Sequence, residues 1–169
     1  VYDHTDNHKE YHRRDGTVLL PLMLNHICKD ETRTMLVARQ ITRLIQNDRK
    51  VIVLSDRIAQ LETLYDLVVR SGIAESTVTY YIGKSSKSVR KEAPSKRLLL
   101  STYSMSREAL DIPALDTLVM ASPTGDVVQA IGRILRQHPN KKTPLIVDMI
   151  DPYSAFDRMR WKRNAYYKK

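Results

Sequence analysis

Residues 50–55 read Lys-Val-Ile-Val-Leu-Ser, a short run that is almost entirely apolar and rich in β-branched side chains. A run of this length and composition predicts a β-strand that is buried on both faces of a sheet. Helix-length segments separate it from similar apolar runs, an alternation that is typical of an α/β fold with a parallel sheet. The further predicted strands are residues 77–82, 97–102, 117–121 and 144–149.

The segments between these strands carry helix signals. Asp30 and Asp56 can each cap the first turn of a helix, and Ser71-Gly72 is a typical helix end. We expect one domain over residues 18–169, preceded by a polar arm or linker over residues 1–17, with a basic loop at residues 83–96. The predicted helices are residues 18–28, 30–46, 56–71, 126–137 and 151–166.

Length and composition narrow the class of protein. The chain has 169 residues, enough to bury a core without disulfides. It has no apolar run of membrane-spanning length, so no contact with a membrane is expected. Its single cysteine, Cys28, excludes a disulfide framework and a cysteine zinc site and is expected to lie in the core. These features predict an intracellular protein.

The positive charge is concentrated in two segments. The chain has 28 Lys and Arg against 19 Asp and Glu, a formal net charge of +9. Residues 84–97 carry +5 and residues 158–169 carry +6, so the remainder is slightly acidic. Clustered positive charge predicts a polyanionic partner such as nucleic acid. The alternative is a solvated basic loop and a basic tail.

Residues 129–136 read Gln-Ala-Ile-Gly-Arg-Ile-Leu-Arg. On a helix, at about 100° per residue, Gln129, Gly132, Arg133 and Arg136 share one side. Glycine inside a helix costs up to about 1 kcal/mol relative to Ala, so Gly132 indicates a close approach from outside. Paired guanidinium groups match phosphate oxygens; the alternative is a surface helix whose arginines meet Asp or Glu. The residues expected to face the core are Val128, Ile131 and Leu135.

This pattern, Gln-x-x-Gly-Arg-x-x-Arg, resembles the last motif of superfamily 2 helicases. Residues 51–57 resemble the strand and turn that open the second RecA-like domain of these enzymes, and residues 101–113 resemble the penultimate motif. Residues 118–123 are similar to the strand between the two motifs. The stretch from Ile146 to Tyr166 is similar to the end of helicases from large DNA viruses, of which the transcript-release type is the nearest group. Several motifs in order are specific where one alone is weak.

The resemblance implies a fold, a RecA-like parallel sheet with helices on both faces, and roles for single residues. It places Arg136 as the arginine finger on ATP, with Arg133 beside it on the triphosphate. Gln129, Gly132 and Asp111 take the positions that help to bind or sense the nucleotide. One departure is Ala109, where the family has glycine. The residues implied or expected to contact nucleic-acid phosphates are Ser55, Arg57, Thr102, Lys84 and Lys87.

A complete helicase also needs a phosphate-binding loop and a metal-binding acidic pair. Gly83-Lys84-Ser85 lacks the earlier glycine of such a loop, because position 78 is Val78, and no Asp-Glu-x-Asp box is present. We therefore expect the second half of a two-domain motor, in which a first RecA-like domain binds most of ATP and Mg²⁺. Val1 in place of an initiator Met is expected for a fragment or a processed chain. The isolated domain is expected to be essentially inactive.

Some features leave alternatives open. A non-catalytic RecA-like module that binds nucleic acid or a partner is the rival to the motor. His4, His8 and His12 recur at helical spacing and form a metal-binding face only if the arm is helical, so no metal site is expected. Trp161 is expected to pack the last helix on the sheet rather than to stack on bases. A viral protein of this kind is expected to act in transcription or DNA metabolism, in the host cytoplasm or the virion.

Overall fold

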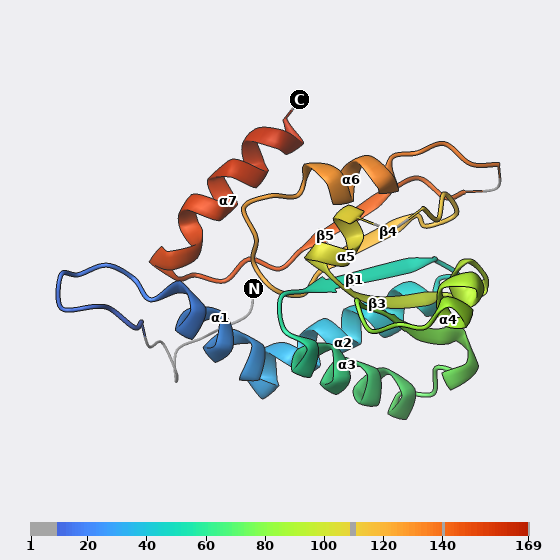
Figure 1. Ribbon diagram of the computed structural model, residues 1–169, viewed down its shortest axis with the longest axis horizontal. Helices are drawn as coiled ribbons and strands as arrows, with labels where there is room; N and C mark the ends of the chain where they lie inside the picture. Colours follow the sequence, from blue (N-terminus) through green and yellow to red (C-terminus); the bar gives the residue numbers. More distant parts are fainter. Residues whose placement is uncertain (1–9, 109–110, 140, 169) are drawn as a thin grey trace.

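The computed structural model describes residues 10–108, 111–139 and 141–168 of the chain. Its centre is one sheet of five parallel strands in the order β2-β3-β1-β4-β5 (Figure 1). Each predicted strand is confirmed, with its ends within one residue of the predicted ones. The strands are β1 (Val51–Ser55), β2 (Val78–Tyr81), β3 (Leu98–Thr102), β4 (Thr117–Met120) and β5 (Leu145–Asp148).

Helices cover both faces of the sheet, as the α/β pattern predicts (Figure 1). Val51 and Val53 of β1 pack with α2 and α3 on one face, and Ile52 and Leu54 pack with α5 and α6 on the other. Alternate side chains of a strand point to opposite faces, so a continuously apolar strand fills both cores at once. The helices are α1 (Leu20–Lys29), α2 (Glu31–Gln46), α3 (Ile58–Arg70), α4 (Lys87–Glu92), α5 (Tyr103–Glu108), α6 (Val128–Ile134) and α7 (Ser154–Tyr167).

The helix ends follow the predicted signals only in part. Asp30 caps α2 by accepting a hydrogen bond from the amide of Arg33 at 2.8 Å. Gly72 ends α3 with a left-handed φ of +93°. Asp56 does not cap α3, which begins at Ile58 without a side-chain cap; in the turn before it, the Ser55 hydroxyl accepts from the amide of Arg57 at 3.0 Å.

Four segments depart clearly from the predicted elements. The basic segment predicted as a loop, residues 83–96, contains the short helix α4. Helix α5 directly follows β3 and was not expected as a helix. The helix predicted over residues 126–137 covers only 128–134, and α7 begins at residue 154 rather than 151.

The described part of the predicted arm is attached to the domain. Its backbone forms a short hairpin, in which the amide of Leu19 donates to the carbonyl of Tyr11 at 2.8 Å. The carboxylate of Glu10 accepts hydrogen bonds from the amide and hydroxyl of Ser154 at 2.6 and 2.7 Å. His4 and His8 lie outside the described residues. Across the described ranges, no helix combines the length and apolar character needed to cross a membrane.

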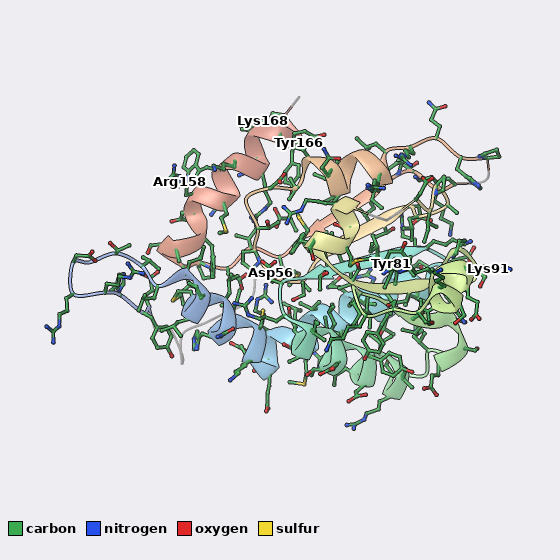
Figure 2. All side chains as sticks on the ribbon, in the orientation of Figure 1. Asp56, Tyr81, Lys91, Arg158, Tyr166 and Lys168 are labelled. Atoms are coloured by element: carbon green, nitrogen blue, oxygen red, sulfur yellow. The ribbon has the colours of Figure 1, made fainter. Side chains whose placement is uncertain are left out.

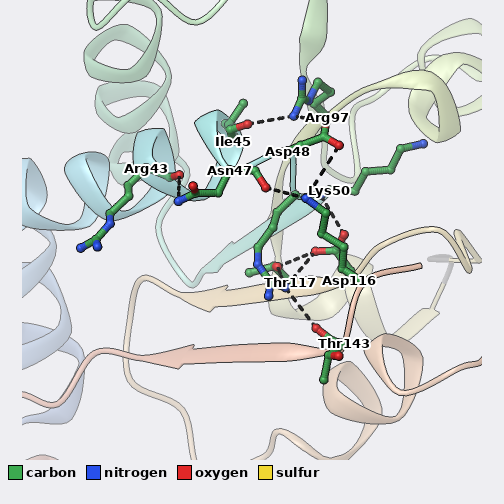
Figure 3. Close-up of polar contacts among 11 residues, drawn as sticks. Arg43, Ile45, Asn47, Asp48, Lys50, Arg97, Asp116, Thr117 and Thr143 are labelled. Carbon is green, nitrogen blue, oxygen red and sulfur yellow. Dashed lines mark hydrogen bonds and ion pairs between the residues drawn. The ribbon is translucent and has the colours of Figure 1, made fainter. Parts of the chain in front are cut away.

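At the amino-terminal edge of the sheet, polar groups are paired with one another (Figure 3). The Asp116 carboxylate accepts from the Lys50 amide at 3.2 Å and from Arg49 at 3.4 Å. Arg97 donates to the Ile45 carbonyl and to Asp48, both at 2.8 Å. Paired charges of this kind connect α2, β1 and β4, and they indicate that this edge is structural.

Candidate functional site

Two of the predicted site residues lie at the carboxyl ends of neighbouring strands. Ser55 at the end of β1 lies beside Thr102 at the end of β3 in the parallel ladder. Met120 ends β4 next to Leu54. In open parallel sheets, ligands bind in the crevice outside this edge. The loops that follow β1, β3 and β4 therefore form the candidate site.

Helix α6 carries the arginine motif, but with a different inward face from the predicted one. Ala130 and Ile134 are buried together with Ile131, whereas Val128 and Leu135 are 48% and 53% exposed. The prediction that Val128 and Leu135 face the core was wrong. Ala130 and Ile134 join Ile131 in the apolar side that packs on the sheet, so α6 is rotated from its predicted orientation.

The motif residues of α6 face outward. Gln129 and Gly132 are exposed and Arg133 is half-buried. A Cβ atom built on Gly132 would meet no atom within 4 Å, so the surface over this glycine is open. The helix ends at Ile134, so Arg136 stands on the bend beyond it.

The penultimate and last motifs meet where α5 packs beside α6. Arg136 donates to the carboxylate of Asp111, forming an ion pair whose side chains are 48% and 75% exposed. Arg133 donates to the carbonyl of Arg107 at 2.7 Å, and the guanidinium of Arg107 lies 3.3 Å from Asp126. Arg136 thus pairs with an aspartate, as the alternative of a surface helix with paired arginines requires. That aspartate, Asp111, belongs to the penultimate motif.

The predicted phosphate-contacting residues at β1 and β3 differ in exposure. Ser55 is fully buried, and its hydroxyl donates to Gln60 at 2.7 Å, so it positions the turn rather than reaching solvent. Arg57 is half-buried and donates to Asn25 of α1 at 2.6 Å. Thr102 is half-buried, with its hydroxyl 3.0 Å from that of Ser104 at the start of α5.

The basic segment after β2 remains accessible. Lys84 and Lys87 are exposed, one in the turn after β2 and the other at the start of α4. The hydroxyl of Ser85 donates to the Tyr80 carbonyl at 3.0 Å and accepts from the Ile82 amide at 2.9 Å. Ser85 thus closes a tight turn, which fits the expectation that Gly83-Lys84-Ser85 is no phosphate-binding loop.

Two buried ion pairs support the carboxyl edge, and the sequence patterns did not reveal them. Arg33 of α2 is fully buried and bonds both carboxylate oxygens of Asp151, at 2.5 and 2.8 Å. It also donates to the Ala121 carbonyl just after β4, at 2.6 Å. Arg163 of α7 pairs with Asp148 at 2.8 Å. One sequence signal pointed to the burial of Arg33: it lies in the first turn of an amphipathic helix, next to residues that face the core.

Two further buried groups near this edge are inert. The Tyr103 hydroxyl donates to the Ser122 carbonyl at 2.6 Å, and burial holds the pKa of this tyrosine well above its usual value. Burial also raises the pKa of the Cys28 thiol to about 11. The thiol is therefore neutral near pH 7, and the expectation of a core cysteine is confirmed.

The last helix places its aromatic residues differently from the prediction. Phe156 is buried against α1 and not on the sheet, where it was also expected to pack. Trp161 is 74% exposed, so the prediction that it packs on the sheet was wrong. The reason is that Arg163, paired with Asp148, takes the inward position of that turn.

No family model matches this sequence. The fold nevertheless defines a class, that of RecA-like domains with a parallel sheet between helices. Among proteins of known sequence, the chain is 28% identical over 148 residues to "Putative ATP-dependent RNA helicase L396" of Acanthamoeba polyphaga mimivirus, covering 87% of this chain and 28% of that protein. It is 30% identical over 94 residues to the QP509L protein of African swine fever virus, whose name carries the same description, covering 54% of this chain and 18% of that protein.

The chain therefore spans between about a fifth and about a quarter of the length of these relatives. Among solved structures, it superposes on UvsW of phage T4 with a TM-score of 0.70 at 17% identity, covering 88% of this chain and 35% of that one. The DEAD-box protein SrmB of E. coli gives 0.61 at 16% identity, with 79% of each chain covered. The predicted likeness to viral helicases of superfamily 2, and the predicted RecA-like fold, are confirmed.

Proposed function

We propose that this chain is the second motor domain of an ATP-dependent superfamily 2 helicase or translocase. The observation that carries the proposal is the ion pair between Arg136, just after α6, and Asp111, in the segment that follows α5. The two residues come from separate motifs, 25 positions apart in the chain. A paired arginine and aspartate at the place where the resemblance puts the nucleotide supports a motor more than a simple binding module.

The donor set on and just after α6 fits a triphosphate. The guanidinium groups of Arg133 and Arg136 supply planar, permanently charged donors that match phosphate oxygens. The open surface over Gly132 leaves room for a group to approach the backbone of α6 closely. Within the proposal, ATP with Mg²⁺ is bound mainly by a first RecA-like domain, which supplies the phosphate-binding loop, and it is hydrolysed only when both domains are present.

In this arrangement each residue has a defined task. Arg136 leaves Asp111 and aims its guanidinium at the charge that develops on the γ-phosphate, and Arg133 is held in place through the Arg107 carbonyl. Thr102, Arg57, Lys84 and Lys87 line the track for a nucleic-acid backbone.

The relatives are named as RNA helicases, which makes RNA the first substrate to test. A role in viral transcription or DNA metabolism is part of the proposal.

The test is ATP hydrolysis by the longer protein that contains this domain, with Arg136→Ala. We expect the rate to fall by about 10³-fold or more, the range measured for arginine fingers, while affinity for nucleic acid stays within about twofold. Arg70→Ala removes an equally exposed arginine at the end of α3 and serves as the matched control. Full hydrolysis in the Arg136 variant would exclude the arginine-finger role, and an absence of ATPase in the wild type would favour the non-catalytic module.

A further inference from the structure

The outer face of α7 combines one aromatic side chain with several cations. Trp161, the only tryptophan of the chain, is the most exposed of its large apolar side chains in the described residues, at 74%. At about 100° and 1.5 Å per residue, Arg158, Trp161, Lys162 and Lys168 share one side of the helix over a length of about 15 Å. Figure 2 shows Arg158 and Lys168 projecting from the outer side of α7.

The cations of this face are available to a ligand. Among the described residues, no carboxylate pairs with Arg158, Lys162 or Lys168. Asp157, at the edge of the face, is the one acid of the helix. By contrast, Arg163 on the inner side is paired with Asp148 and donates to the Thr124 carbonyl at 2.7 Å. Arg163 therefore holds α7 in place on the domain, whereas the outer cations form no such bonds to the rest of the described chain.

The outer face adjoins the candidate site. The side chain of Lys162 lies over Gly125, with its Cδ atom 3.7 Å from the position that a Cβ of this glycine would take. Gly125 belongs to the loop that connects β4 to α6, so the face continues from the carboxyl edge where the proposed track lies. A strand that leaves that edge can pass directly onto α7.

We propose that the outer face of α7 binds single-stranded nucleic acid, with Trp161 stacked on a base and Arg158, Lys162 and Lys168 on the phosphates around it. Stacking on an exposed aromatic ring tolerates any sequence because every base has a π face, and flanking cations attract the backbone. This surface extends the track of the proposed motor, and it rests on that function only for the choice of a nucleic-acid strand as its ligand.

Trp161 supplies its own assay because its fluorescence reports this face alone. The 169-residue chain is titrated with single-stranded oligouridine and oligothymidine, and with a duplex of equal length. We expect saturable quenching by the single strands, weaker quenching by the duplex, and an affinity that falls as salt rises. A fluorescein-labelled strand, followed by anisotropy, measures binding anywhere on the chain.

Variants separate stacking from general attraction. Trp161→Ala should weaken binding of the labelled strand by roughly 5- to 150-fold, the loss expected for one stacked base, and Trp161→Phe should restore most of it. Arg160→Ala, which removes a cation from the other flank of α7, is the matched control and should leave binding unchanged. Unchanged melting temperatures verify that each variant is folded.

Each remaining outcome has one meaning. Binding seen by anisotropy without a change in Trp161 fluorescence would place the strand elsewhere and overturn the inference, while leaving the proposed motor intact. Equal losses for Trp161→Ala and Arg160→Ala would overturn it too, because only general charge would then matter. Quenching that depends on protein concentration, without added nucleic acid, would assign the face to contact between copies of the chain.

Discussion

Replacing Gly132 by alanine should make the domain more stable. Gly132 lies inside the exposed side of α6, and a Cβ atom there meets nothing within 4 Å. Its φ lies outside the left-handed region. Among the glycines, only Gly16 and Gly72 have a φ inside that region. The change therefore removes the entropic cost of glycine in a helix without introducing a clash. We expect a gain of about 0.5–1 kcal/mol in the free energy of unfolding, or about 1–4 °C in melting temperature for a chain of this size.

The same chemical change at Gly72 is the control with the opposite sign. A Cβ at Gly72 also meets nothing within 4 Å, but its φ of +93° is a conformation that alanine adopts only with strain. Gly72→Ala should cost about 1–2 kcal/mol. Because the two sites differ in backbone conformation and not in packing, the contrast isolates the backbone effect.

Urea denaturation of both variants measures these shifts, and ATP hydrolysis by the longer protein supplies a second readout. If Gly132 exists to admit a close approach, Gly132→Ala should slow hydrolysis although it stabilises the fold. A variant that is both more stable and fully active would show that the open surface over α6 has no functional use. A variant that is less stable than the wild type would refute the structural reasoning itself.

The remaining predictions concern the buried ion pair of Arg33 with Asp151 and the hydroxyl of Tyr80. Arg33→Met should cost about 3–5 kcal/mol in urea denaturation because it leaves Asp151 charged and buried, and the double variant with Asp151→Leu should recover most of that loss. A single variant within about 1 kcal/mol of the wild type would contradict this. The pKa of Tyr80 is raised to about 12, mainly by burial. The neutral hydroxyl of Tyr80 therefore contributes fully to the stability of the fold below about pH 10, and this contribution is lost as the pH rises from there to about 12. Tyr80→Phe should flatten the fall in denaturation midpoint over that range, and an unchanged slope would exclude the role of Tyr80.

The strands were predictable because their signal is local. Each of the five is a short apolar run, and burial on both faces of a parallel sheet demands such a run, so composition alone locates it to within a residue. Helix ends were less predictable because they depend on competing caps. The turn after β1 shows this: α3 begins at Ile58 without a side-chain cap, and the Ser55 hydroxyl binds the amide of Arg57, the residue before the helix.

The site was predictable only where a motif carried it. Gln129, Gly132, Arg133 and Asp111 were predicted through spacing and resemblance, and the structure brings their two motifs into contact. Arg33 was missed because its partner, Asp151, is 118 residues away, and no local pattern announces a pair that is made by the fold.

The same reasoning explains why net charge is a poor guide to binding. Arg97 counts toward the +9 as fully as Arg158 does, yet Arg97 is held by Asp48 and the Ile45 carbonyl, whereas Arg158 forms no ion pair with a carboxylate among the described residues. Affinity for a single strand falls with salt by about 0.7 per phosphate neutralised on a double logarithmic scale. Arg158→Ala should therefore reduce that slope by about 0.7, and Arg97→Ala, which removes an equal charge, should leave it unchanged. Equal reductions would mean that the overall field attracts the strand, and that pairing within the fold does not decide which cations bind.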